Sequence, residues 1–250
     1  MRMRMCVSCC FFAAVLAAQT TAPAAVPVAD EPSHHLALQN EYVRVFKVEV
    51  APRSATLLHG HDKDYVFVTL GGSEVSNERQ GEKPVTLKLH DGETRFTKGG
   101  FAHVARNLSD KPFRNVTIEL LKPAPPENSG ERIVIESTQS IDPKLGPKCL
   151  GHGLKQDLRQ RNCWYSEATD RYTMSMVQLL PGANTGAHQH KTGHLVVAIS
   201  DLELRSEITG MPPSQIIQRA GDVKWVPGGF THTLTNVGKK PARFVTFEFE

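Results

Sequence analysis

Residues 221–236 read GDVKWVPGGFTHTLTN, and residues 92–107 read GETRFTKGGFAHVARN. Both stretches begin with glycine, contain a Gly-Gly-Phe triplet followed two residues later by histidine, and end with asparagine. An offset of 129 positions superposes them without a gap. The same offset pairs residues upstream and downstream of this block: Pro52 with Pro181, His59 with His188, His61 with His190, and Val116 with Val245. Repetition at one fixed offset predicts two copies of a single structural unit.

Each copy consists of short runs that are typical of β-strands. Residues 42–52, YVRVFKVEVAP, alternate apolar and polar side chains, and the runs YVFVTLGG at 65–72 and HLVVAIS at 194–200 are rich in β-branched residues. Neither copy shows a long helical periodicity. The expected fold is therefore all-β, with two tandem antiparallel β-barrels of the jelly-roll type over residues 36–122 and 171–250, joined by a linker over residues 123–170.

The N-terminus has the pattern of a secretory signal peptide. Residues 1–4 are basic, and a largely apolar run over 5–18 and an alanine-rich stretch follow them. The apolar run is shorter than the ~20 residues that a membrane-spanning helix needs. We therefore expect a signal peptide over residues 1–24 and a mature protein that is periplasmic or secreted, with no integral membrane segment after signal removal.

Charge and cysteine content limit the partners of the mature chain. The formal net charge of the whole chain is +3, and Arg2 and Arg4 lie in the expected signal peptide. The remaining charge is close to neutral, so nucleic acid is not an expected partner. Cys149 and Cys163 would be the two cysteines of the mature chain. In an oxidising compartment an even pair predicts a disulfide, with two free thiols as the alternative.

Pairs of histidines stand two residues apart in both copies, at His59 and His61 and at His188 and His190. Strand residues two apart point to the same face of a sheet, which in a small barrel can be the interior. Imidazoles inside an apolar barrel are costly unless their nitrogens are satisfied, and a metal ion commonly satisfies them. The pairs therefore indicate two metal sites.

The glycine, histidine and asparagine blocks, together with the histidine pairs upstream, resemble the two signature motifs of the cupin superfamily. The duplication makes the chain similar to a bicupin of the exported bacterial type. The second motif of copy two matches at Gly221, Pro227, Gly229, His232 and Asn236, whereas copy one has Lys98 in place of the proline. The resemblance implies a double-stranded β-helix barrel in each half, with a divalent metal held by three histidines and a glutamate.

Carried over onto this chain, the resemblance implies two sets of metal ligands. The C-terminal set, our first choice, is His188, His190, His194 and His232, and the N-terminal set, our second choice, is His59, His61 and His103. The glutamate position of the motif holds His194 in copy two, which would act as a fourth nitrogen ligand. In copy one it holds Tyr65, which we expect to donate a hydrogen bond into the cavity, while Asp64 is an alternative ligand.

Nitrogen ligands favour transition metals over Mg and Ca. Because the superfamily includes three-histidine iron dioxygenases, Fe is expected first, with Cu, Ni, Zn or Mn as alternatives. The predicted function is a metal-dependent dioxygenase acting on a small oxygenated molecule as substrate. A non-catalytic binding protein and a metal-dependent isomerase or lyase are the alternatives. Oxalate-type decarboxylation is less expected because neither copy keeps the glutamate. Formation of a homo-oligomer stays open.

Two other kinds of residue are expected to have no direct role in metal binding. His34 and His35 closely follow the expected signal peptide, and we expect them to be disordered. Asn107 and Asn236 end the repeated blocks, where we expect them to satisfy backbone groups near a turn rather than to contact a metal.

Overall fold

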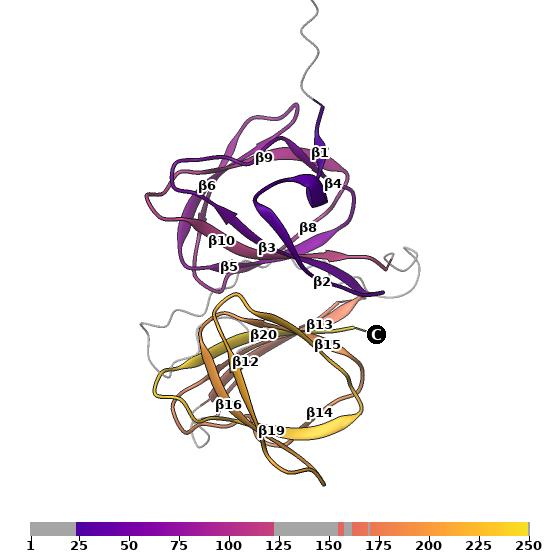
Figure 1. Ribbon diagram of the computed structural model, residues 1–250, viewed down its shortest axis with the longest axis vertical. Coiled ribbons are helices and arrows are strands. Elements are labelled where there is room, and N and C mark those ends of the chain that lie inside the picture. Colours follow the sequence, from indigo (N-terminus) through magenta and orange to yellow (C-terminus); the bar gives the residue numbers. More distant parts are fainter. Residues whose placement is uncertain (1–23, 123–154, 158–161, 170, 250) are drawn as a thin grey trace, which may run out of the picture.

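The computed structural model describes residues 24–122, 155–157, 162–169 and 171–249. Apart from one 3-10 turn at Val28–Asp30, these residues form strands and loops. No helix among them is long and apolar enough to cross a membrane. The strands build two barrels that lie one above the other (Figure 1). The predicted all-β fold with two tandem barrels is confirmed.

The N-terminal barrel consists of two five-stranded sheets. In order of neighbours, the first sheet is β1 (Val26–Pro27), β4 (His59–His61), β9 (Phe101–Asn107), β6 (Ser73–Arg79) and β7 (Val85–Leu89). The second is β2 (His34–Gln39), β3 (Val43–Val50), β10 (Phe113–Leu120), β5 (Tyr65–Leu70) and β8 (Thr94–Thr97).

The C-terminal barrel repeats this arrangement. One sheet is β11 (Lys155–Asp157), β12 (Asn162–Ala168), β13 (Tyr172–Leu179), β20 (Ala242–Phe249), β15 (His194–Ala198) and β18 (Val223–Val226). The other is β14 (His188–His190), β19 (Phe230–Asn236), β16 (Leu202–Ile208) and β17 (Ser214–Gln218). The repeat offset maps β4 onto β14, β6 onto β16, β9 onto β19 and β10 onto β20.

Some expectations concern segments outside the two repeats. The sheets include β1 and β12, which precede the repeated ranges 36–122 and 171–250. The expected signal peptide falls almost entirely on residues outside the described part of the chain. Cys149 also lies outside the described residues, and so does the expected Cys149–Cys163 bridge.

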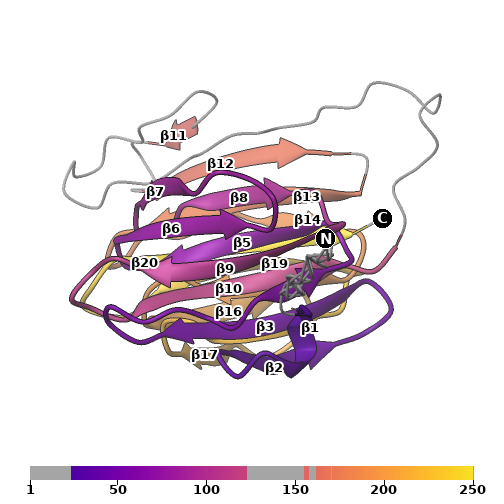
Figure 2. The ribbon, with the colours of Figure 1, turned by 90° about the horizontal axis from the view of Figure 1, so that it is seen from above.

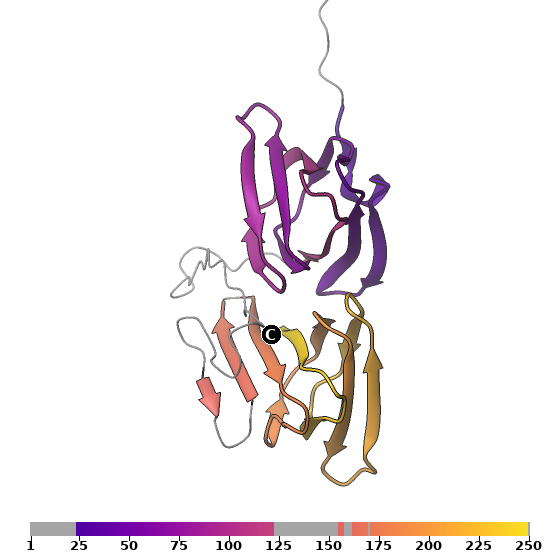
Figure 3. The ribbon, with the colours of Figure 1, turned by 90° about the vertical axis from the view of Figure 1, so that its left-hand side faces the viewer.

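The two barrels share one hydrophobic core. Along β10, Val116, Ile118 and Leu120 are buried in a cluster that also contains Leu195 and Phe247 of the C-terminal barrel. Figure 3 shows the two barrels stacked against each other from the side, and Figure 2 shows the strands running across this stack. Each fully buried side chain of this size contributes roughly 1.5–3 kcal/mol, so the interface stabilises both barrels.

Side chains of β10 alternate between the two faces of its sheet, so those that do not face the other barrel point into the interior of their own barrel. Phe113, Asn115 and Thr117 line a cavity inside the N-terminal barrel. In β20 the equivalent parity provides Phe244 and Thr246 to a cavity in the C-terminal barrel. Because side chains alternate along a strand, packing the barrels together on one face directs the opposite face towards the candidate sites.

Ion pairs surround the interface between the barrels. Arg171 Nη1 lies 2.7 Å from Asp64 Oδ2, and Lys47 Nζ lies 2.8 Å from Asp222 Oδ1. Arg243, which is buried, pairs with the carboxylate of Asp91. These contacts fix the register of one barrel on the other with charges of opposite sign.

The asparagines that end the repeated blocks bind the backbone, as expected. Asn236 Nδ2 donates to the carbonyl oxygens of Leu179 and Lys240, both at 2.8 Å. Asn107 Nδ2 donates to equivalent carbonyls, including that of Lys111 at 2.7 Å. Each asparagine therefore ties the end of a histidine-bearing strand, β9 or β19, to the neighbouring turns.

Candidate metal centres

The C-terminal barrel brings together three of its four predicted ligands. His188 and His190 lie on β14, and His232 lies on β19 directly opposite His188. The Nε2 atoms of His188 and His232 are 2.9 Å apart. One ring nitrogen from each of the three histidines falls within a group in which all separations are below 4.8 Å. The predicted convergence of imidazoles from separate strands is therefore present in the fold.

The outer nitrogens of this trio have partners. His188 Nδ1 lies 3.1 Å from the carbonyl oxygen of Gly186, and His190 Nδ1 lies 3.3 Å from Glu248 Oε2. A ring that donates its Nδ1–H to such acceptors keeps Nε2 as the free lone pair. Both rings are thus held in the tautomer that a metal site requires.

His194 occupies a different position from the other three. Its ring stacks on that of His190, with the centroids 3.8 Å apart and the planes inclined by 20°. It is 2% exposed, and its Nδ1 has no hydrogen-bond partner among the described residues. The structure places His194 beside the trio but does not include it in the group of converging nitrogens.

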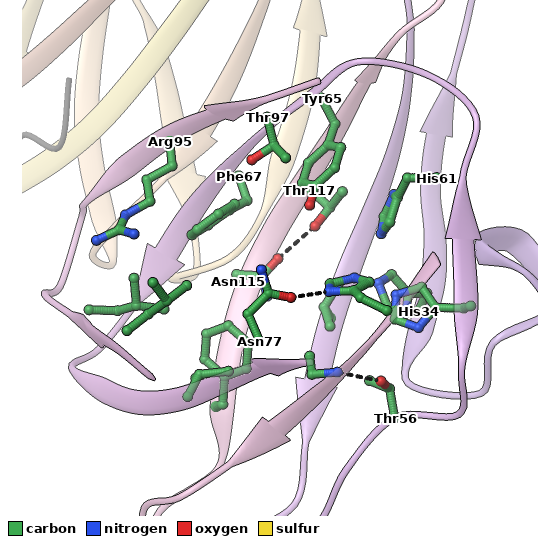
Figure 4. A pocket seen from close by; sticks show the side chains of 18 of the residues that line it. His34, Thr56, His61, Tyr65, Phe67, Asn77, Arg95, Thr97, Asn115 and Thr117 are labelled. Atoms are coloured by element: carbon green, nitrogen blue, oxygen red, sulfur yellow. Dashed lines mark hydrogen bonds between the residues drawn. The ribbon is translucent and has the colours of Figure 1, made fainter. Parts of the chain in front are cut away.

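The N-terminal barrel contains a cluster of four histidines. His59 and His61 lie on β4, and His103 lies on β9 opposite His59. The fourth, His34, comes from β2, and its nitrogen converges with those of His59 and His61 to within 4.8 Å. His103 is close by, with its ring centroid 4.5 Å from that of His59, and its Nδ1 lies 2.6 Å from Asn77 Oδ1 (Figure 4).

The expectation that His34 and His35 are disordered is wrong, because both lie on β2. A register shift between Leu36 and Leu38 places His34 opposite Val48, a residue that lines the cavity. The ring is buried, and its Nδ1 lies 2.6 Å from Glu31 Oε2. The apolar residues Leu36, Ala37 and Leu38, just before the strand-like run at 42–52, were a signal for this extra strand, but the bulge that turns His34 inward has no sequence signature.

Several of these nitrogens lack partners. His59 Nε2 and His103 Nε2 are buried without a hydrogen-bond partner among the described residues, whereas His61 Nδ1 faces the Glu119 carboxylate at 3.8 Å. Buried polar atoms are nearly always satisfied, so an unpaired group needs an explanation. A cation held by the ring nitrogens supplies one, and the donor set therefore fits a transition metal.

Burial also determines the charge of the rings. It lowers the pKa of His59 to about 4 and that of His103 to about 2. In the C-terminal barrel, burial lowers the pKa of His194 to about 4 and that of His232 to about 3. The imidazoles are therefore neutral near pH 7, which is the form that binds metals.

Each cluster has a carboxylate that the motif does not predict. Glu119 on β10 is fully buried, with Oε1 3.8 Å from His61 Nδ1 and Oε2 2.6 Å from Arg44 Nη2. Glu248 on β20 is its equivalent in the repeat, and it accepts from the backbone N–H of Thr192 as well as contacting His190. The carboxylate that is absent from the first motif is thus provided by the last strand of each barrel.

Tyr65, at the glutamate position of copy one, and Asp64, one residue before it, have separate roles. Asp64 accepts from the backbone N–H of Gly99 and pairs with Arg171 of the other barrel, so its carboxylate is engaged away from the histidines. Tyr65 stacks on His61 with centroids 4.3 Å apart and lines the cavity. Burial raises the pKa of Tyr65 to about 12, so its hydroxyl remains a hydrogen-bond donor.

The glycine pairs of the motif explain how the histidine strands are held. A Cβ on Gly99 would lie 2.5 Å from the backbone of Lys63, and one on Gly228 would lie 2.3 Å from the backbone of Thr192. The second glycine of each pair has a positive φ, +85° at Gly100 and +89° at Gly229. Only glycine allows this approach, which packs the start of β9 or β19 against the loop after the histidine pair.

A cavity adjoins each cluster. The N-terminal cavity has a volume of about 380 Å³, and Tyr65, Asn77, Arg79 and Asn115 are among its lining residues. The C-terminal cavity is larger, about 590 Å³, and Ile208, Phe230 and Phe244 are among its lining residues. Both volumes are in the range of small-molecule sites.

Comparison with solved structures identifies the fold. The crystal structure of AerE from Microcystis aeruginosa matches with a TM-score of 0.58 and 12% identity, covering 88% of this chain and 98% of that one. A structure of Bacillus subtilis oxalate decarboxylase, described for its Mn(II) centres, matches with a TM-score of 0.55 and 13% identity, covering 92% and 78%. No protein-family model and no curated protein matches the sequence. At these identities the likeness shows a shared two-barrel, cupin-like fold.

Proposed function

We propose that this chain is an exported, metal-dependent bicupin enzyme that oxidises a small oxygenated molecule in a dioxygenase-type reaction. The observation that carries the proposal is the convergence of three histidines in each barrel, with the ligand nitrogens of each trio within 4.8 Å of one another. The cavity beside each trio supports a small-molecule substrate.

His188, His190 and His232 are the proposed ligands of the C-terminal site. His34, His59, His61 and His103 are the candidates in the N-terminal site. His194 stacks on His190. We therefore propose that His194 orients the His190 ring and is not the expected fourth ligand. Measurement of metal content in His194→Ala separates the two roles, since loss of a ligand lowers it and loss of a stacking partner leaves it nearly unchanged.

The donor set consists of neutral nitrogens, which favours Fe, Cu, Ni or Zn over Mg and Ca. We propose Fe, and Mn is retained because the oxalate decarboxylase with a similar fold has Mn(II) centres. When bound, such an ion supplies a Lewis acid that polarises a substrate oxygen. The chain itself orients the rings through Gly186, Asn77 and the two carboxylates.

The carboxylates on the last strands support a divalent ion in a second way. Neutral ligands leave the charge of the ion uncompensated, and in a low-dielectric interior that is costly. Glu119 and Glu248 each place a negative charge within 4.0 Å of a ring nitrogen of the second histidine in the pair. They balance part of the charge without occupying a ligand position.

A non-catalytic binding protein is the second candidate. The observation that favours it is the absence of the motif glutamate in both copies, at Tyr65 and His194. A metal-dependent isomerase or lyase would use the same ligands without oxygen.

Elemental analysis of the purified protein, followed by O2-uptake measurements with diketones and catechol-like compounds, tests the proposal. Bound iron together with substrate-dependent uptake supports the dioxygenase. Bound iron or copper without uptake on a broad panel supports the binding protein, and turnover without uptake supports the isomerase or lyase. Protein that takes up no transition metal overturns both enzyme proposals and the metal-binding form of the non-catalytic one.

The export proposal has its own test. We expect expression of the full chain in a bacterial host to yield a periplasmic or secreted form that has lost the signal peptide. Mass spectrometry should place the new N-terminus after Ala17, Ala18 or Ala24, where small residues favour cleavage. A cytoplasmic protein that retains Met1 contradicts export.

A further inference from the structure

The two cavities differ at one position next to the histidines. Arg79 on β6 lies opposite His103 in the strand register, and Ile208 on β16 lies opposite His232. The repeat offset relates these two positions. The fold therefore places an arginine beside one metal-binding cluster and an isoleucine at the same place beside the other.

Arg79 is only weakly compensated. Its guanidinium lies 4.1 Å from the centroid of the Phe101 ring, which orients it without neutralising it. Its ion pair is with Glu82 at 4.0 Å, and the Glu82 side chain is 60% exposed. Such a long, solvated pair contributes little. The described lining of the N-terminal cavity includes Arg79 but no aspartate or glutamate.

The second arginine of this cavity is engaged differently. Arg95 Nε lies 2.7 Å from Glu93 Oε1, and Glu93 is buried. This pair is neutral overall. Arg79 is therefore the cation of the cavity that is available to a ligand.

Uncharged hydrogen-bonding groups surround the same space. Asn115 Oδ1 accepts a hydrogen bond from the Thr117 hydroxyl at 2.8 Å. The other polar atom of the Asn115 side chain is its amide nitrogen, which is a donor. Figure 4 shows Asn115 and Thr117 beside Tyr65 and Phe67 in the cavity. In the C-terminal barrel the position of Asn115 is taken by Phe244.

A cation next to a metal site is unfavourable on its own. The positive charge of Arg79, opposite His103 in the strand register, repels a divalent ion held by the neighbouring histidines. An anion between the two cations removes the repulsion. Guanidinium binds carboxylates through two parallel hydrogen bonds, so a carboxylate is the anion that best matches this site.

The C-terminal cavity lacks these groups next to its histidines. Its described lining includes one cation, Lys224, which is exposed and is the equivalent of Arg95. Ile208 takes the place of Arg79, and Phe244 takes the place of Asn115. An anion there would be desolvated without a partner near the histidines.

We propose that the N-terminal cavity binds a small carboxylate anion at Arg79 and that the C-terminal cavity binds an uncharged, more apolar ligand. This inference rests on the proposed metal sites and assigns a separate ligand class to each barrel.

The test uses the mature chain loaded with Co²⁺ in one barrel at a time. His188→Ala combined with His232→Ala leaves the N-terminal site, and His59→Ala combined with His61→Ala leaves the C-terminal site. Metal content and melting temperature are measured first. Each form is then titrated with phenylacetate and with its neutral isostere phenylacetamide, by calorimetry and by the Co²⁺ absorption spectrum.

We expect the N-terminal form to bind phenylacetate at least tenfold more tightly than the amide, and the C-terminal form to show the reverse preference. Arg79→Ile should abolish the preference for the anion, and Arg79→Lys should restore part of it. In the C-terminal form, the matched exchange Ile208→Arg should increase binding of phenylacetate. These shifts should occur at unchanged metal content.

Two results overturn the inference, and they can be told apart. If Arg79→Ile binds phenylacetate as tightly as the parent form while keeping its metal, the anion site is wrong and the metal site stands. If neither single-barrel form holds Co²⁺, the proposed function fails, and the ligand assignment fails with it. A C-terminal form that prefers the carboxylate overturns the assignment of different ligand classes to the two barrels.

Discussion

His188 and His232 face each other across β14 and β19 with their Nε2 atoms 2.9 Å apart. Two nitrogens that each lie about 2.1 Å from one ion, at a right angle to each other, are separated by about 3 Å. The backbone pairing of the two strands therefore sets a distance that suits two ligands of one metal. The predictions below test this arrangement and the contacts that support it.

Replacing His232 should remove metal from the C-terminal barrel. His232→Ala eliminates a ligand opposite His188, and we expect metal content by mass spectrometry to fall by about one ion per chain if both barrels are loaded. His90→Ala, at an exposed position outside the clusters, is the control and should leave the content unchanged. Full metal content in His232→Ala would exclude this residue as a ligand.

His34 and His35 form a matched pair for the N-terminal site. They are neighbours on β2, but His34 is buried in the histidine cluster, and His35 is exposed. His34→Ala should weaken metal binding in this barrel by at least about tenfold, whereas His35→Ala should have no effect. The measurement is a competition titration with a chelator on protein whose C-terminal site carries His232→Ala. Equal affinities of the two variants would remove His34 from the site.

The carboxylates on the last strands should tune metal affinity. Glu248→Gln keeps the shape of the side chain but removes the charge next to His190, and we expect metal affinity to fall by about 10- to 100-fold. Glu119→Gln should act in the same way through His61. Glu207→Gln, on an exposed part of β16, is the control. A change in melting temperature without a change in affinity would assign these residues a purely structural role.

Asp64 should matter for stability and not for metal. Asp64→Ala leaves Arg171 without its carboxylate and removes the acceptor for the Gly99 N–H, so the free energy of unfolding should decrease by about 1–3 kcal/mol. Asp110→Ala breaks a fully exposed pair with Arg53 and should lower the free energy of unfolding much less than Asp64→Ala does. Chemical denaturation of the metal-free forms measures both. Loss of metal in Asp64→Ala would instead indicate that Asp64 is a metal ligand.

The metal-free protein should lose stability as the pH falls from about 7 to 5. Burial lowers the pKa of His59 and of His194 to about 4, whereas an unfolded histidine titrates near 6.5. Between these values the unfolded chain binds more protons than the folded one. The contribution to stability is thus complete above about 6.5 and is lost as the pH falls towards 4. Melting temperatures of chelator-treated protein measure this, and a flat profile between pH 7 and 5 would contradict burial of neutral rings.

The local pattern of the sequence was sufficient for the two barrels and for most of the histidine clusters. The offset between His103 and His232 identified the duplication, and the two-residue spacing within each pair placed both rings on one face of a strand. The role of Asn236 also followed from its place at the end of a strand. These features depend on strand periodicity and on tight turns, which are properties of neighbouring residues.

The residues that complete the sites depend on contacts between distant segments. Glu248 reaches His190 because β20 pairs with β15 in one sheet and sets Glu248 opposite His194, and His34 turns inward where a bulge shifts β2 against β3. No local pattern encodes such pairings, since they result from how strands far apart in the chain select partners and register. The same is true of the core between the barrels, because the sequence marks a residue such as Ile118 as apolar but does not say which surface buries it.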